Sequence, residues 1–228
     1  MPRSLTESER EALVIRWRRI LILGLIDFFN GTNDFGKLII KELVDMRESV
    51  IKAYARNLGI PLHSGSRWRS FSDILKDIFN NQSVPTKIKD KLRDIDNFFT
   101  SRQFSFQQLS FSLKDLRNEE THYLNLSDLP KETTIRVWRM FYKLITIIDP
   151  NFFDYTRDRP ETRDFYFLQD FFKKVVLEGN LKEEITKHGG KVLVRIIDLD
   201  KIRRDEEGRE RGIYEMIEFI KSGGYLDF

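Results

Sequence analysis

The chain has 228 residues, of which 40% are hydrophobic and 33% are charged, so it can bury a sizeable core beneath a well-solvated surface. It contains no cysteine, which excludes disulfide bonds, thiolate catalysis and cysteine-based zinc sites. The formal net charge is only +3, because 39 Lys and Arg residues nearly balance 36 Asp and Glu residues. Such a balance permits nucleic-acid binding without requiring it.

No segment predicts a membrane span. The longest apolar run, residues 20–29, includes Gly24 and Asp27 and is about half the roughly 20 residues that cross a bilayer. The first nine residues carry charges where a secretory signal needs an apolar stretch. We therefore expect a cytoplasmic protein with no membrane partner.

Helix signals dominate the N-terminal part of the chain. Thr6 and Glu9 have the spacing of a capping box, which opens a helix expected to run to about Phe29. Asn33 is a candidate cap for a second helix, which Gly59 and Pro61 should end. The apolar stripe of this second helix recurs at helical spacing, at Leu38, Ile39, Leu43, Met46, Val50 and Ile51.

Two shorter helices are predicted next. After a polar loop, Ser70 or Ser72 should open a helix to about Phe79, and Pro85 should lead into another that ends near Phe99.

A further helix is predicted to open at Ser105, where residues 105–108 again have the form of a capping box. Leu109, Leu113 and Leu116 would continue its core-facing stripe, and helical character should fade near Asn125. Pro130 suits the first position of the following helix, which Asp149-Pro150 closes. Phe104, Phe106 and Phe111 are most simply core residues.

The composition changes from Asn151 onward. A turn at residues 157–160 should precede a helix over about residues 161–177, and residues 213–221 suggest a last helix. Between them, residues 191–197 form the one convincing β-branched run, which predicts a strand. The sequence therefore predicts a mostly α protein, with a helical bundle over residues 1–150 and a small C-terminal α+β appendage over residues 151–228.

One polar cluster on the predicted fifth helix carries candidate chemistry. Arg117 and His122 have an Arg-x4-His spacing, and Asn118 directly follows the Arg. In this order, on a late helix of a small bundle, the residues resemble the active-site signature of the HEPN ribonucleases. The resemblance implies a helical bundle, RNA cleavage that needs no metal or other cofactor, and a site assembled across a homodimer. It also implies a toxin or anti-phage (abortive infection) role, with a neutralising antitoxin or regulatory protein as partner.

The residue types suit this reaction. When a 2′-OH attacks the adjacent phosphorus, a 2′,3′-cyclic phosphate forms and the 5′-oxygen leaves. Histidine, whose unperturbed pKa is about 6.5, suits the proton transfers at these two oxygens, and His122 is the candidate. The permanently charged guanidinium of Arg117 would stabilise the phosphorane, and Asn118 would orient His122 or the phosphate. On one helix Arg117 and His122 would be about 140° apart, so two facing copies would be needed to place an Arg and a His from different chains around one protein groove.

Several alternatives stay open. In one alternative, His122 is an ordinary surface residue beside Glu119 and takes no part in catalysis. The chain would then be a non-catalytic helical module that binds nucleic acid or a protein partner. Arg56-Asn57 and His63 satisfy a looser form of the same motif, but Gly59 and Pro61 should break the helix between them.

Two other groups of residues have alternative interpretations. Asp198 and Asp200 could share a metal at the end of the predicted strand, but an ordinary strand-to-turn exit is the preferred interpretation, because no matching acid-x-Lys follows downstream. The triplet Arg67-Trp68-Arg69 could stack on bases and hold phosphates, but a loop that Trp68 anchors to the core is the preferred interpretation.

Overall fold

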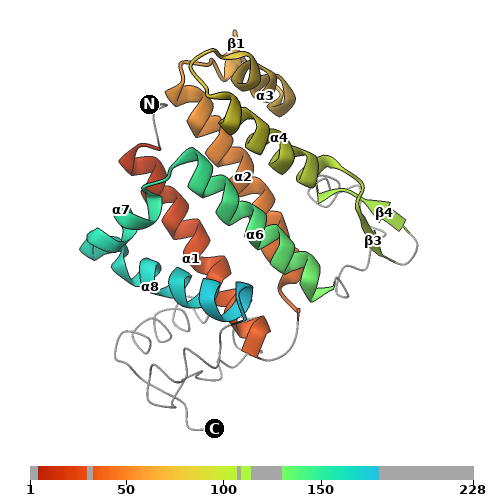
Figure 1. Cartoon of the computed structure of the whole chain (residues 1–228), viewed down its shortest axis with the longest axis vertical. Helices are drawn as coiled ribbons and strands as arrows, with labels where there is room; N and C mark the ends of the chain where they lie inside the picture. The colour runs from red at the N-terminus through yellow and green to blue at the C-terminus, as the bar shows by residue number, and fades with distance from the viewer. Residues whose placement is uncertain (1–4, 30–32, 107–108, 114–129, 180–228) are drawn as a thin grey trace. The chain divides into compact units, whose positions relative to one another are not determined.

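The computed structural model describes residues 5–29, 33–106, 109–113 and 130–179 (Figure 1). Helices dominate these residues, which confirms the predicted mostly α helical bundle. The predicted strand at 191–197 and the last helix at 213–221 lie outside the described residues. The helical elements are α1 (Glu7–Phe29), α2 (Gly36–Asn57), α3 (Phe71–Asn80), α4 (Thr86–Thr100), α6 (Lys131–Ile148), α7 (Phe152–Asp158), η3 (Pro160–Thr162), α8 (Arg163–Phe172) and η4 (Lys173–Leu177).

The chain divides into two compact units, and only their described residues are considered. Unit 1 comprises Met1–Leu13 and Gly36–Phe153, and unit 2 comprises Val14–Phe35 and Asp154–Phe228. The predicted domain boundary at residue 150 stays a prediction, because much of the C-terminal segment is not described. None of the described helices is long and apolar enough to cross a membrane.

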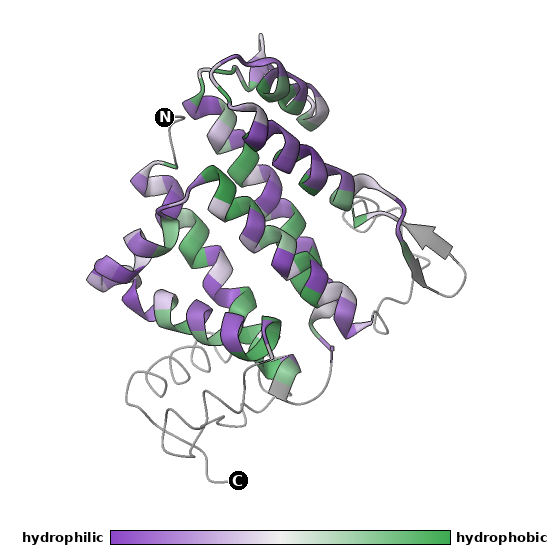
Figure 2. Cartoon of the chain, in the orientation of Figure 1, coloured by the Kyte–Doolittle hydropathy of each residue, from purple (hydrophilic) through white to green (hydrophobic). Residues whose placement is uncertain are grey.

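In unit 1, α2 and α6 pack side by side, α4 packs against α6, and α3 packs against α2 (Figure 1). The helices are green on one side and purple on the other in Figure 2, as expected when each buries an apolar stripe. On α6 this buried stripe includes Val137, Trp138, Phe141, Leu144 and Ile148. On α2 the predicted stripe is buried except at Leu38, which is 40% exposed, so that part of the prediction is wrong.

A buried arginine joins α2 to α3 and α4. Arg47 is 3% exposed and forms an ion pair with Asp96 on α4. Its guanidinium carbon also lies 4.7 Å from the ring centroids of both Phe71 and Phe99. Because a planar guanidinium can stack on rings while its edge binds a carboxylate, one side chain satisfies both kinds of contact.

Two of the predicted N-terminal helix caps are confirmed, and one is wrong. The Thr6 amide donates to Glu9 Oε2 at 2.7 Å and the Glu9 amide donates to Thr6 Oγ1 at 3.4 Å, which is the predicted capping box. Ser70, rather than Ser72, caps α3 by accepting from the Asp73 amide. The predicted cap at Asn33 is wrong, since α2 begins at Gly36.

The predicted opening of a helix at Ser105 is also wrong, and the rest of that predicted helix, from residue 114 to about Asn125, lies outside the described residues. Phe104–Phe106 (β3) and Leu109–Phe111 (β4) instead form an antiparallel hairpin, in which Phe104 pairs with Phe111 and Phe106 with Leu109. The sequence alternates apolar and polar residues in both runs, with a mirror-like order about residues 107–108. That period of two is typical of a strand, and it outweighs the capping-box pattern of Ser105 to Gln108.

Unit 2 contains most of α1 and most of α7, together with η3, α8 and η4. The rings of Trp17 and Phe165 meet edge to face, with centroids 5.5 Å apart, and Arg18 Nη2 lies 2.9 Å from Asp164 Oδ1. The helix predicted over residues 161–177 is divided among a 3-10 turn, an α-helix and a π-helical turn. The helix α7 was not predicted, because only a turn was expected around residues 157–160.

Candidate functional site

The predicted catalytic residues Arg117, Asn118 and His122 lie outside the described residues, as do Asp198 and Asp200. The structure therefore neither brings the motif residues together nor separates them. It does describe both sides of the motif segment: β4 with Ser112 and Leu113 precedes it, and α6 follows it. Ser112 and Leu113 are both buried.

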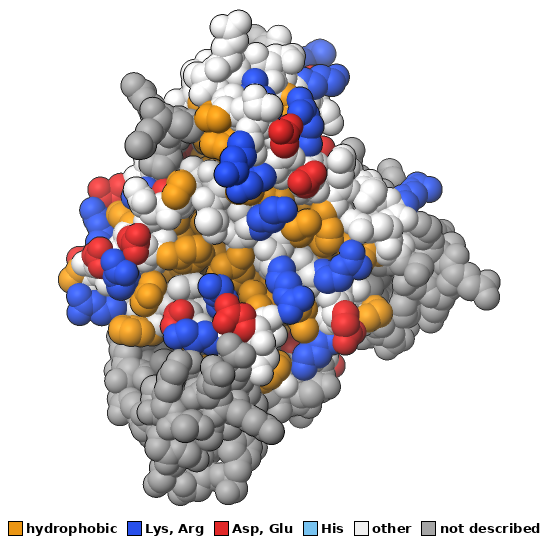
Figure 3. Space-filling model, in the orientation of Figure 1, with side chains coloured by type: hydrophobic (Ala, Val, Ile, Leu, Met, Phe, Trp, Pro, Cys, Tyr) orange, Lys and Arg blue, Asp and Glu red, His pale blue; other side chains and the backbone are white. Residues whose placement is uncertain are grey.

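The exposed face of α6 is basic, a feature that was not predicted. Arg136, Arg139 and Lys143 are all exposed, and at 100° per residue they fall within an arc of about 60°, opposite the buried stripe. Figure 3 shows Lys and Arg side chains gathered over α6 on the face turned to the viewer. The signal in the sequence is the i, i+3, i+7 spacing of these three cations, which matches that of one helix face.

Arg136 is held in place from a neighbouring part of unit 1. Its Nη2 donates to Gln103 Oε1 at 3.1 Å, and its guanidinium carbon lies 5.5 Å from the Phe98 ring centroid and 5.2 Å from that of Phe104. Lys143 makes no ion pair with any described residue. The basic face of α6, defined as Arg136, Arg139 and Lys143, thus offers positive charge to an anionic partner.

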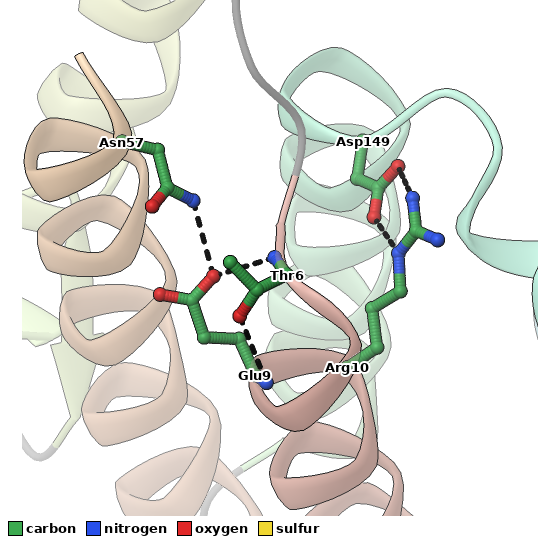
Figure 4. Close-up of polar contacts among 5 residues, drawn as sticks. All are labelled: Thr6, Glu9, Arg10, Asn57 and Asp149. Atoms are coloured by element: carbon green, nitrogen blue, oxygen red, sulfur yellow. Dashed lines mark hydrogen bonds and ion pairs between the residues drawn. The ribbon is translucent and has the colours of Figure 1, made fainter.

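The second Arg-Asn…His match does not form a site. Asn57 Nδ2 donates to Glu9 Oε2 at 3.1 Å (Figure 4). Arg56 forms an ion pair with Glu9, so both side chains are engaged by the start of α1. The α2 helix ends at Asn57, and Gly59 follows with a φ of +79°.

The backbone explains why the chain turns away at this point. The Gly59 amide donates to the Arg56 carbonyl and the Ile60 amide donates to the Ala55 carbonyl, both at 2.9 Å. This pair of bonds is a Schellman motif, which needs a left-handed residue at the position of Gly59. The predicted helix break before His63 is therefore confirmed.

Glu9 is the polar centre of the junction between the start of α1 and the end of α2. Burial raises the pKa of its carboxyl group, but hydrogen bonds from the Thr6 amide, Arg56, Asn57 and the Thr6 hydroxyl outweigh burial. The net result is a pKa below the ordinary value of 4.5, so Glu9 stays ionised where it binds Arg56. The arrangement ties the start of α1 to the end of α2.

His63 lies instead on a second hairpin, formed by His63–Ser64 (β1) and Arg67–Trp68 (β2). The ring centroids of His63 and Trp68 are 3.9 Å apart, with planes inclined by 41°. Trp68 is 68% exposed, so the prediction that it anchors a loop to the core is wrong. The signal for this hairpin is Gly65-Ser66 between two short runs, and Gly65 has the positive φ of +60° that mirror-image hairpin turns require.

Among the described residues, no group of three or more His, Asp or Glu side chains is placed to hold a metal ion.

Compared with protein-family models, with curated proteins and with solved structures, the chain gives no match.

Proposed function

We propose that the chain is an endoribonuclease of the HEPN type, which cleaves RNA without a metal ion. Arg117 would stabilise the phosphorane, His122 would transfer protons, and Asn118 would orient His122 or the phosphate. The observation that carries the proposal is the order of the bundle: the Arg-Asn-x3-His segment lies directly before α6, whose exposed face is basic at Arg136, Arg139 and Lys143. Such a face offers positive charge to the phosphates of a polyanionic substrate.

The same proposal includes a homodimer. If the segment is helical, Arg117 and His122 are splayed by about 140°, and one phosphate is reached only when a second copy supplies the missing group. A toxin or anti-phage role, a neutralising partner and a cytoplasmic location belong to this proposal through the resemblance alone.

The test is an RNA-cleavage assay in EDTA that compares the wild type with His122→Ala. We expect metal-independent cleavage by the wild type and at least about 100-fold slower cleavage by the variant, the low end for a positioned acid-base group. Cleavage that stops in EDTA, or that survives His122→Ala, would overturn the proposal and return attention to Asp198 and Asp200.

A non-catalytic nucleic-acid-binding module is the second candidate, and the exposed Trp68 favours it specifically. RNA binding without cleavage on any RNA tested would support this candidate. Catalysis and binding are therefore measured on the same preparation.

A further inference from the structure

Trp68 is the most exposed of the large hydrophobic side chains in the part of the chain that the structure describes. Its 68% exposure exceeds that of Ile15, Phe167 and Leu38, which range from 57% down to 40%. Leaving a tryptophan ring in water forfeits burial of a large apolar surface. A binding partner that covers the ring would recover that free energy.

The hairpin holds the ring in a defined place. His63 and Trp68 are Cα partners across β1 and β2, and their rings are in contact. The base of the hairpin is fixed through Arg69, whose amide donates to the Leu62 carbonyl at 3.0 Å. Arg69 Nη1 donates to the Pro61 carbonyl at 3.0 Å, and Nη2 lies 2.7 Å from Asp77 Oδ2 on α3. The ring pair is thus presented on a supported turn rather than on a loose loop.

The charged residues within the hairpin segment itself are positive. Residues 61–70 contain two arginines and no acidic residue. Arg69 is committed to Asp77, whereas Arg67 is exposed and has no ion-pair partner among the described residues. Adjacent strand residues point to opposite faces, so Arg67 contributes long-range attraction and a contact at the hairpin edge rather than a bond beside the ring.

The surroundings of Trp68 fit a nucleobase better than a protein surface. A protein-docking patch usually presents several adjoining apolar side chains, whereas the residues that precede Trp68 in the hairpin, Ser64 to Arg67, are exposed and not apolar, and its ring contacts that of His63. A single flat aromatic ring among polar and cationic groups is the arrangement that single-strand-binding proteins use for bases, with each stack worth about 1–3 kcal/mol. We propose that the β1-β2 hairpin binds single-stranded RNA, with one base stacked on Trp68 and a phosphate attracted by Arg67.

This inference takes its RNA ligand from the proposed function, but it does not require the chain to cleave RNA. Binding is therefore measured with His122→Ala, which removes cleavage as a complication. The chain has three tryptophans, and Trp17 and Trp138 are 0% and 1% exposed. A ligand that stacks on tryptophan should quench the fluorescence of Trp68 alone.

The probe is a short single-stranded RNA of mixed sequence, titrated while tryptophan fluorescence and RNA anisotropy are recorded. We expect quenching in the His122→Ala protein and, after Trp68→Ala is added, binding weakened by about 5- to 150-fold as for one lost base stack. Trp68→Phe should retain most of the affinity. Phe167→Ala, which removes another exposed aromatic ring, should leave binding unchanged.

Arg67→Ala should lower the slope of log affinity against log salt by about one, as for the loss of one phosphate contact. Arg93→Ala, with the same change of net charge on α4, should leave the slope unchanged. Single-stranded DNA of the same sequence should bind comparably through stacking, and duplex RNA should bind more weakly because its bases are already stacked.

Equal RNA affinity of folded Trp68→Ala and its parent would overturn the proposal, as would absence of quenching or of any RNA binding. Circular dichroism checks that the variants are folded, and an exposed side chain should be dispensable for folding. Unchanged RNA affinity of Trp68→Ala, together with metal-independent cleavage by the wild type, would overturn this inference while leaving the proposed nuclease intact. RNA binding that depends on Trp68, without cleavage of any RNA, would support this inference and overturn the proposed nuclease.

Discussion

Arg10 and Asp149 form a two-pronged ion pair that joins the start of α1 to the end of α6 within unit 1. Arg10 Nε lies 2.6 Å from Asp149 Oδ2 and Arg10 Nη2 lies 2.7 Å from Oδ1 (Figure 4). The Asp149 side chain is 0% exposed and that of Arg10 is 15% exposed. Two parallel N–H···O bonds fix the geometry of the pair and satisfy both carboxylate oxygens.

Arg10→Ala should destabilise the protein by about 3 kcal/mol, because it leaves a buried carboxylate without its counter-ion. Chemical denaturation measures the change. Arg93→Ala is the matched control, since Arg93 pairs with Asp90 while both side chains are more than half exposed, and it should cost at most about 1 kcal/mol. Equal losses in the two variants would mean that burial of Asp149 is not what makes its pair important.

Glu9 makes stability depend on pH in the acid range. Its pKa is lowered in the folded protein, so between the ordinary value of 4.5 and the folded value the unfolded chain binds more protons. The stability that Glu9 contributes is thus complete above pH 4.5 and is lost as the pH falls through the folded pKa. Glu9→Gln should show a smaller acid-induced loss than wild type in denaturation measured from pH 6 to pH 3. Parallel pH curves for the two proteins would contradict this sign.

Arg47→Lys should be destabilising although it keeps the charge. A lysine ammonium can approach Asp96, but it cannot stack its plane on Phe71 and Phe99 while doing so. We expect a loss of about 1–3 kcal/mol, measured by denaturant unfolding.

Arg93→Lys provides the comparison for Arg47. The guanidinium carbon of Arg93 lies 5.0 Å from the Phe79 ring centroid, but its side chain is 51% exposed. Its replacement should change stability by less than about 0.5 kcal/mol. A larger loss at Arg93 than at Arg47 would show that burial does not strengthen these contacts.

The capped helices of unit 1 could be predicted because their signals are local. Thr6 with Glu9 and Ser70 with Asp73 act within one turn of chain, and Gly59 has a conformation that few other residues adopt. Trp68 could not be placed in the same way, since a tryptophan's burial depends on segments distant in sequence. At Ser105 two local signals conflicted, and the alternation of apolar residues, rather than the cap, matched the structure.

In the candidate site, too, local sequence signals predict some features, whereas others depend on segments distant in the sequence. The chemistry of Arg117 and His122 could be argued from residue types, but their juxtaposition depends on tertiary or subunit contacts that spacing does not encode. The basic face of α6 has a simple sequence signal at Arg136, Arg139 and Lys143, yet it becomes interpretable only once the opposite stripe is known to be buried.

The last prediction separates the two Arg-Asn…His matches by their effect on RNA cleavage. Arg117→Ala should slow cleavage at least about 100-fold, whereas Arg56→Ala should leave it nearly unchanged. The physical reason is that Arg56 is directed to Glu9, and the chain reverses at Gly59 before reaching His63. Losing the Arg56 pair should cost only about 0–1 kcal/mol, because the Arg56 side chain is 61% exposed.

Cleavage rates of Arg56→Ala and Arg117→Ala are compared in EDTA, well below the unfolding temperature of either variant, so that a small loss of stability does not appear as a loss of activity. Glu9→Gln serves as the control for the junction: it should loosen the hold on Arg56 and Asn57 without reducing cleavage. Slow cleavage by Arg56→Ala together with normal cleavage by Arg117→Ala would place the active site at the end of α2, where Glu9 would then act by positioning Arg56 rather than by joining two helices.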